Sequence, residues 1–234
     1  MNTRILALQV GSLLWATVAV APLPVNAADL FDDFAGSALD LSRWSIPDGA
    51  PGISVAGGLL VFSGDPDHKR VESVASFAPG VTGLLATAVI NPAGDYQKFG
   101  LGQLTGPLAI YFDTYDDSLG ENTNSIRTLV YSYSSSSLLF NESAPVSWGS
   151  FHRFAIEWLP SRIRFLIDGS PASEFSYLTT TESLPVGVWN DRTPTMQVDM
   201  VSVSAVPAPA TVWLMAAGLF TLLGVKRTRT HLFA

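Results

Sequence analysis

Residues 197–204 carry the pattern that most limits how this chain can fold, because polar and apolar side chains alternate along most of the segment. A two-residue period puts the apolar side chains on one face of a β-strand. Further short runs rich in β-branched and aromatic residues lie at 59–62, 84–90, 108–112, 129–133, 151–158 and 162–167. Gly- and Pro-containing turns separate these runs, and none of them keeps a helical period beyond two turns. Many short strands without intervening helices predict an antiparallel β-sandwich or barrel.

The N-terminus has the three parts of a secretory signal peptide. Arg4 supplies a positive charge, residues 5–20 are uncharged and mostly apolar, and Val25 and Ala27 stand at the −3 and −1 positions of a cleavage site. We therefore predict a signal peptide at 1–27 and export of the chain that follows. The absence of cysteine is compatible with an oxidising compartment and means that no disulfide stabilises the fold.

The C-terminus has the pattern of a membrane-spanning segment. Residues 210–225 contain no charge, and Lys226, Arg227 and Arg229 follow at once. The apolar run is close to the ~20 residues that a helix needs to cross hydrocarbon, and the basic end stays in the cytoplasm by the positive-inside rule. We predict a transmembrane helix at 210–225 and a cytoplasmic end at 230–234. A buried core helix is the alternative, but it would have no reason to end in three cations.

A Pro-containing motif with Val206, Pro207 and Pro209 comes just before this run. The motif, the apolar run and the basic end span residues 206–229. In this order they resemble the PEP-CTERM sorting signal of Gram-negative bacteria that make exopolysaccharide, in the form where Val-Pro-x-Pro replaces Pro-Glu-Pro. The resemblance implies an exosortase-type processing enzyme as partner and an inner-membrane-tethered precursor. It also implies a final place at the cell surface or in the extracellular matrix.

Residues 28–205 remain between the two signals, a length that suits one domain with a sizeable core. This segment holds all 20 acidic residues and nine of the 13 basic ones, so its net charge is −11. Such a balance argues against binding nucleic acid through a basic patch. It suits a soluble domain that meets neutral sugars or cations, although acidity can also serve solubility alone.

Three stretches resemble the concanavalin A-like jelly roll of laminarinases, lichenases and L-type lectins. They are the opening segment at 32–44, the pair of predicted strands at 151–169, and the closing strand at 198–203. The resemblance implies an all-β, antiparallel jelly-roll sandwich over residues 28–205. The aromatic residues of these motifs are expected to fill its core: Trp44, Phe154, Trp158 and Phe165.

The jelly-roll glycosidases of this family carry Glu-x-Asp-x-Glu on one strand, so that two carboxyl groups flank one glycosidic bond. The corresponding stretch here is expected to be Tyr111, Asp113 and Tyr115, in which both glutamate positions hold tyrosine. A phenol is a poor substitute for a carboxylic acid. We therefore expect no catalytic residues at these positions and lean towards a protein that is not an enzyme.

The same stretch is similar to the calcium-binding strand and loop of legume-type lectins. That resemblance implies a Ca²⁺ held by Asp113, the carbonyl of Tyr115 and Asp117, all oxygen ligands; a solvated acidic loop is the alternative. Aromatic faces stack on sugars, so the candidates for glycan binding are Tyr111, Asp113, Tyr115, Tyr131, Tyr133 and Trp148. Half-buried strand aromatics are the alternative for any one of them.

No Gly-x-Ser-x-Gly motif is present, and three histidines without cysteine give no sequence case for a Ser-His-Asp site. The leading hypothesis is an exported, surface-sorted, non-catalytic protein that binds carbohydrate or associates with an exopolysaccharide matrix. The first alternative is a glycan-active enzyme, a glycosidase or lyase that uses other residues such as Asp113, Tyr115 and Glu157. The second alternative is a purely structural surface protein.

Overall fold

A computed structural model describes residues 29–49, 51–63, 69–80, 83–94, 96–102, 107–115, 124–177, 182–191 and 195–206. The predicted signal peptide, the predicted transmembrane helix, Asp117 and the sorting residues after Val206 lie outside these ranges. Within the ranges, no helix is long and apolar enough to span a membrane.

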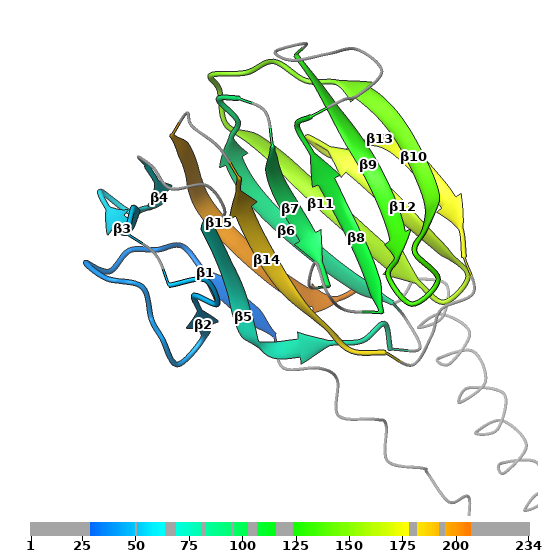
Figure 1. The fold of residues 1–234 in the computed structure, drawn as a ribbon, viewed down its shortest axis with the longest axis horizontal. Coiled ribbons are helices and arrows are strands. Elements are labelled where there is room, and N and C mark those ends of the chain that lie inside the picture. Colours follow the sequence, from blue (N-terminus) through cyan, green and yellow to red (C-terminus); the bar gives the residue numbers. More distant parts are fainter. Residues whose placement is uncertain are drawn as a thin grey trace, which may run out of the picture.

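The described residues form two antiparallel sheets packed face to face (Figure 1). The eight-stranded sheet has the order β13 (Ser170–Ser176), β12 (Arg162–Ile167), β11 (His152–Leu159), β6 (Leu84–Asn91), β15 (Met196–Ala205), β4 (Leu59–Phe62) and β3 (Ile53–Ala56), with β1 (Leu30–Asp32) also paired to β15. The seven-stranded sheet has the order β10 (Ser137–Pro145), β9 (Ser125–Ser132), β8 (Leu108–Asp113), β7 (Gln97–Leu101), β14 (Leu184–Asn190), β5 (Lys69–Phe77) and β2 (Trp44–Ser45). This architecture confirms the predicted all-β antiparallel sandwich.

The alternating segment that predicted strands is β15, which lies inside the eight-stranded sheet. Val198, Val201 and Val203 are buried in the core between the sheets. The alternation breaks at Met200, where two apolar residues follow each other, and the pairing with β6 shifts register between Val198 and Met200. A β-bulge of this kind keeps the valines on both sides of the break turned towards the same core.

The core holds the aromatic residues that the motifs predicted: Trp44, Phe154, Trp158 and Phe165 are each 1 % exposed or less. The opening segment is fixed by Asp32, whose carboxylate accepts hydrogen bonds from the Trp44 indole N–H at 2.7 Å and from the Phe34 N–H at 2.8 Å. Phe34 packs its ring 6.0 Å from that of Trp44. The segment 32–44 is thereby tied to the hydrophobic core.

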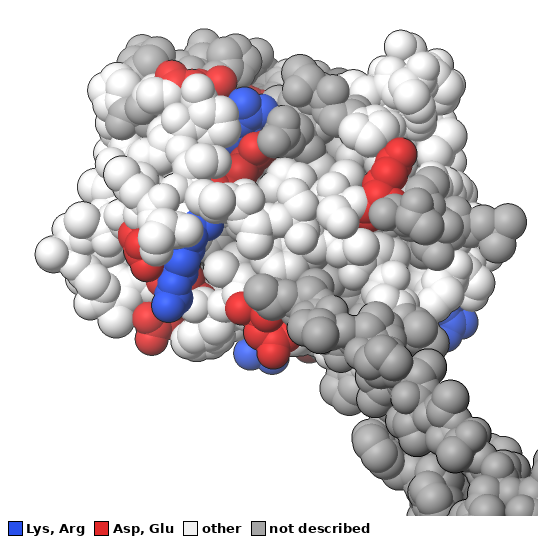
Figure 2. Space-filling view, turned by 90° about the horizontal axis from the view of Figure 1, so that it is seen from below, with Lys and Arg blue, Asp and Glu red and all other residues white. Residues whose placement is uncertain are grey.

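Charged side chains of both signs are mixed among uncharged residues on the face of the described residues that Figure 2 shows. Several cations of the described residues are paired, among them Arg162 and Arg164 with Glu174 and Arg43 with Asp40.

Candidate functional site

The seven-stranded sheet has one face against the core and one face turned away from it, here called the outer face. On β8, Leu108, Ile110 and Phe112 are buried in the core. Successive side chains of a strand point to opposite sides, so Ala109, Tyr111 and Asp113 belong to the outer face.

Strand pairing places a row of polar side chains across this face. Asp113 lies opposite Arg127 of β9 on one side and opposite Lys98 of β7 on the other. Lys98 in turn lies opposite Trp189 of β14, and Trp189 lies opposite Arg70 of β5. These five residues, the central row, come from five neighbouring strands that are far apart in the sequence.

Asp113 is the buried carboxyl group of the central row, with 3 % of its surface exposed. Arg127 Nη2 donates to Asp113 Oδ2 at 3.1 Å, and the Tyr115 N–H donates to Oδ1 at 3.0 Å. Burial raises the pKa of Asp113, although Lys98, the Tyr115 N–H and Arg127 act in the opposite direction. The result is a carboxyl group that keeps its proton to a higher pH than an exposed aspartate.

Tyrosines stand beside Asp113 on the same face. Tyr131 lies opposite Ala109, and the rings of Tyr131 and Tyr133 meet edge to face at 4.6 Å. Burial, and then the nearby Asp113 and Tyr133, raise the pKa of Tyr111 above its ordinary range. Tyr111 is therefore a neutral phenol that can donate and accept hydrogen bonds, and the structure brings four of the predicted ligand-binding residues together.

Tyr115 lies beyond the end of β8 and stacks on Tyr96, with ring centroids 4.1 Å apart. The cation of Arg127 stands 5.4 Å from the Tyr115 ring, and Lys98 stands 6.0 Å from the Tyr96 ring. Tyr115 is therefore not part of the strand, but it stays beside Asp113 and Arg127. The outer-face positions within β8 are 109, 111 and 113, and Tyr115 follows two residues after the strand ends.

Arg70, Glu72, Lys98 and Trp189 were missed in the sequence because none stands in a recognisable motif. Glu72, opposite Gly187, is 2 % exposed; its Oε1 lies 3.6 Å from Arg70 Nε. Burial raises the pKa of Glu72, against the influence of Arg70. The nearby Trp189 indole N–H lowers the pKa of Glu72 to a smaller extent. Neither the Trp189 indole nitrogen nor Glu72 Oε1 has a hydrogen-bond partner among the described residues.

Gly187 is what allows Glu72 and Trp189 to lie so close together. A Cβ at this position would stand 3.0 Å from Glu72 Cγ and 3.1 Å from Trp189 Cζ2. At the other side of Trp189, Lys98 forms an ion pair with Asp191. This part of the outer face thus holds a buried carboxyl group and a buried indole beside a half-buried guanidinium, which are kinds of group that bind sugars.

The predicted Ca²⁺ at Asp113 does not fit the described contacts. Oδ2 faces the cation of Arg127 and Oδ1 accepts a backbone hydrogen bond. A calcium ion needs six to eight oxygen ligands, and a guanidinium on the same carboxylate repels it. No group of three potential metal-ligating side chains is found among the described residues, and Asp117 lies outside them.

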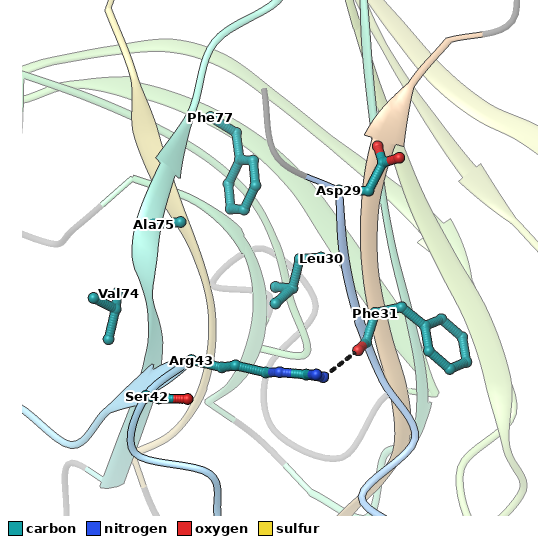
Figure 3. A pocket seen from close by; sticks show the side chains of 8 residues that line it. All are labelled: Asp29, Leu30, Phe31, Ser42, Arg43, Val74, Ala75 and Phe77. Carbon is teal, nitrogen blue, oxygen red and sulfur yellow. Dashed lines mark hydrogen bonds between the residues drawn. The ribbon is translucent and has the colours of Figure 1, made fainter. Parts of the chain in front are cut away.

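Trp148 lies apart from the tyrosines of the outer face. It follows β10, packs against the hydrophobic core and lines a cavity of about 470 Å³ with Asn124, Pro145, Val146 and Ser147. Another cavity, of about 620 Å³, lies between β1 and β5, where Arg43 reaches across to donate a 2.8 Å hydrogen bond to the Phe31 carbonyl (Figure 3). Its lining is mainly apolar and includes none of the central row.

Comparison with known proteins shows which fold the domain shares. The sequence model of glycosyl hydrolases family 16 matches residues 113–221, a little under half of the chain. The endo-β-1,3-glucanase from Pyrococcus furiosus is 17 % identical, with a TM-score of 0.58 over 77 % of this chain and 94 % of that one. The fold is therefore the concanavalin A-like jelly roll of family 16 glycosyl hydrolases.

Two further structures share this fold. The Bacillus licheniformis β-glucanase is 15 % identical, with a TM-score of 0.61 over 76 % of this chain and 98 % of that one. The Crh5 transglycosylase is 16 % identical, with a TM-score of 0.60 over 77 % and 85 %. No curated protein matches the sequence.

These findings overturn the leading hypothesis of a non-catalytic carbohydrate-binding protein. The family match and the similar structures point to glycosidases and transglycosylases, so they support the alternative of a glycan-active enzyme. That hypothesis depended on Tyr111 and Tyr115 as replacements for two glutamates, and this assignment stays a prediction. The sorting signal, its processing enzyme and the cellular location are not touched by these comparisons and stay predictions.

Proposed function

We propose that the protein is a glycan-active enzyme that hydrolyses or transfers β-linked glucan chains bound across the outer face, with Asp113 as general acid and base. The observation that carries the proposal is the position of Asp113, a buried carboxyl group with a raised pKa between Arg127 and Lys98 of the central row. A carboxyl group of this kind can give a proton to a leaving glycosidic oxygen. The family match and the shared fold support the same class of reaction.

Glu72 is too distant to act with Asp113 on one bond. Their strands are three positions apart in the sheet, about 14 Å at the usual spacing between strands. Paired glycosidase carboxyl groups stand about 5 to 9.5 Å apart. We assign Glu72, with Arg70 and Trp189, to binding sugar units away from the reacting bond.

Tyr111 favours glycosidic cleavage over lyase chemistry. A lyase needs a base that takes a proton from carbon, and a phenol whose pKa is raised by burial and by Asp113 is a weak proton acceptor at neutral pH. As a neutral hydrogen-bonding group, Tyr111 suits the binding of a sugar hydroxyl next to Asp113.

The test is polysaccharide cleavage by the full chain. Laminarin and lichenan are incubated with wild type and with Asp113→Asn, and new reducing ends and shortened or lengthened chains are measured by chromatography. Glu157→Gln is the matched control, because Glu157 pairs with Arg164 at 2.7 Å in the other sheet. We expect cleavage or transfer that is lost in Asp113→Asn and kept in Glu157→Gln. Equal activity in both variants would exclude Asp113 as the acid and base.

We propose as well that the enzyme acts outside the cytoplasm, after export and processing at the motif that begins with Val206. The support is the sequence alone. Mass spectrometry of the protein from cells with and without an exosortase-type enzyme tests it. Detection of the uncleaved C-terminal tail in both kinds of cell would contradict the proposal.

A further inference from the structure

Lys98 of the central row has two carboxyl groups within reach on the outer face. It lies directly opposite Asp113 of β8, and the Cβ atoms of such a pair are about 5 Å apart. On its other side Lys98 lies opposite Trp189, and Asp191 follows Trp189 by two residues. Asp191 is therefore a diagonal neighbour of Lys98, at about 7 to 8 Å, which a long side chain can still reach. Register alone allows the ammonium to bind either carboxyl group.

The Lys98 ammonium binds Asp191. Nζ forms an ion pair with Asp191 Oδ2, and the two side chains are only 11 % and 12 % exposed, so solvent screens their attraction weakly. The Asp191 N–H donates to the Tyr96 carbonyl oxygen at 3.0 Å, which continues the pairing of β14 with β7 beyond Asn190. Within the described part of the chain, no ion pair joins Lys98 to Asp113. The backbone thus holds the Asp191 carboxylate where it takes up the ammonium.

Asp113 makes its hydrogen bonds with other partners. Its Oδ2 accepts from Arg127 Nη2 at 3.1 Å, and its Oδ1 accepts from the Tyr115 N–H at 3.0 Å. Burial raises the pKa of Asp113, and the charge of Lys98 is the largest of the influences that lower it. A direct ion pair with this ammonium would lower that pKa further, because an opposite charge within about 4 to 6 Å favours the carboxylate.

Tyr111 and Arg127 also lie beside Asp113 on the outer face, and each keeps a constant charge near neutral pH. Burial, and then the nearby Asp113, raise the pKa of Tyr111, so its phenol stays neutral. The guanidinium of Arg127 is not deprotonated in proteins. The Tyr96 ring lies near the Lys98 ammonium, with 6.0 Å between Nζ and the ring centroid. The place of the Lys98 ammonium is therefore what a change elsewhere in the row can alter.

We propose that Asp191 is a positioning residue for the proposed reaction: it binds the Lys98 ammonium and keeps it from pairing with Asp113, so that Asp113 holds the proton that it gives to the glycosidic oxygen. Asp191 acts through Lys98 and takes no part in the bond changes. Only the last step, the transfer of the proton to a glycan, rests on the proposed function. The effect of Asp191 on the Asp113 proton belongs to the protein without substrate and can be measured there.

Replacing Asp191 with Asn tests the positioning role, because the amide keeps the size of the side chain and loses the charge that binds the ammonium. We expect Lys98 to turn to Asp113, directly opposite, and the pKa of Asp113 to fall by about one unit or more. Carbon NMR of the full chain in detergent micelles, labelled at the aspartate carboxyl carbons, measures this titration. The Asp113 signal is the one that disappears in Asp113→Asn.

The double variant Lys98→Met with Asp191→Asn separates the role of the charge from a general disturbance of the sheet. It removes both members of the ion pair, so no buried charge is left unpaired and the chain should fold. The pKa of Asp113 should then rise above its wild-type value, because Lys98 lowers it. The single and the double variant are thus expected to shift the titration in opposite directions, which a purely structural role would not produce.

Asp48→Asn is the matched control. Asp48 also pairs with a cation of the central row, since its Oδ2 lies 3.3 Å from Arg70 Nε, but Arg70 is on β5, three strands from β8. Loss of this carboxylate should leave the Asp113 titration as in wild type. A shift equal to that of Asp191→Asn would show that any lost acidic charge has the same effect, and would overturn the proposal.

Glucan cleavage gives a second measurement. A general acid works in its protonated form, so activity falls as the pH rises through its pKa. This fall should move to lower pH in Asp191→Asn and to higher pH in the double variant, by the shifts that NMR gives for Asp113. The pH profile of kcat/KM on laminarin, measured for the three proteins, checks it.

An Asp113 titration in Asp191→Asn that equals wild type, or that moves to higher pH, overturns the proposal. If this variant does not fold, the double variant decides, and an Asp113 titration that equals wild type overturns the proposal there. Titrations that shift as expected in a protein without glucan cleavage would overturn the proposed function and uphold the effect of Asp191 on the Asp113 proton. Cleavage that requires Asp113, with titrations that do not shift, would do the reverse.

Discussion

Arg127 and Asp113 face each other across β9 and β8 with 3.1 Å between Nη2 and Oδ2, and both side chains are at least nine-tenths buried. The pair combines two effects on the Asp113 proton. Burial disfavours the charged carboxylate, and the guanidinium favours it. Arg127 therefore limits how far the pKa of Asp113 rises.

Replacing Arg127 with Gln should raise the pKa of Asp113 further. A carboxyl group with a pKa above its unfolded value binds more protons in the folded state, so stability falls as pH rises from the unfolded pKa through the folded one. We expect this fall to extend to higher pH in Arg127→Gln and to reach about 3 to 5 kcal/mol. Urea unfolding at several pH values between about 4 and 9 measures this pH dependence.

The double variant Asp113→Asn with Arg127→Gln is the control for this titration. Without the carboxyl group, the added pH dependence should disappear. A slope in Arg127→Gln that matches wild type would show that the guanidinium does not govern this proton.

The adjacent Asp32 and Asp33 should differ in their effect on stability. Asp32 accepts hydrogen bonds from the buried Trp44 indole and from Phe34, while Asp33 is exposed and accepts a 3.3 Å hydrogen bond from Ala35. Asp32→Ala should cost about 1 to 3 kcal/mol, because it leaves a buried donor unpaired. Asp33→Ala should stay within about 0.5 kcal/mol. Thermal unfolding of both variants measures this, and equal losses would contradict the role of Asp32.

Gly100 permits close approach of β7 to β8. A Cβ there would stand 2.2 Å from the Ile110 carbonyl oxygen and 2.4 Å from Tyr111 Cβ. Gly100→Ala should therefore disturb the strand that carries Asp113 and reduce both stability and glycan cleavage. Gly57→Ala is the matched control: Gly57 has a φ of +62° but open space around it, so its cost should be about 1 to 2 kcal/mol with activity kept. Folding and activity of Gly100→Ala equal to wild type would refute this account.

Glu72→Gln should weaken substrate binding more than it slows the reaction. Its carboxyl group lies on the outer face, three strands from Asp113, and is assigned to sugar binding. Loss of about one hydrogen bond corresponds to roughly a three- to tenfold rise in KM, with kcat unchanged. Steady-state kinetics with the glucan substrate measure kcat and KM for this variant. A drop in kcat at constant KM would place Glu72 at the reacting bond.

The fold and its core could be predicted because they depend on local patterns. Trp44, Trp158 and the alternation around Val198 follow from short-range periodicity and from motifs within a few residues. The bulge at Met200 could be suspected from two apolar neighbours, but its direction is set by pairing with Val89 of β6. Such pairing is a property of the assembled sheet.

The candidate sites could be predicted less well, because they join residues from distant parts of the chain. Asp113 and Tyr111 were found since they share a strand, whereas Arg70 and Trp189 come from strands whose order in the sheet no local pattern reveals. Tyr115 was assigned from the spacing of the family motif, which does not reveal that β8 ends at Asp113. His152 and Asp168 meet because the β11–β12 hairpin brings the start of β11 beside the end of β12.

The two-residue turn at Asp168 and Gly169 fixes the register between β12 and β13. One inserted residue would change the register beyond the turn, and Phe175 and Glu174 would exchange the side of the sheet that each occupies. It would also draw Asp168 away from His152 and Arg153. The exposed serine turn between β9 and β10 has no such dependence, so natural or engineered changes of length are expected there, while the β12–β13 turn should keep its length.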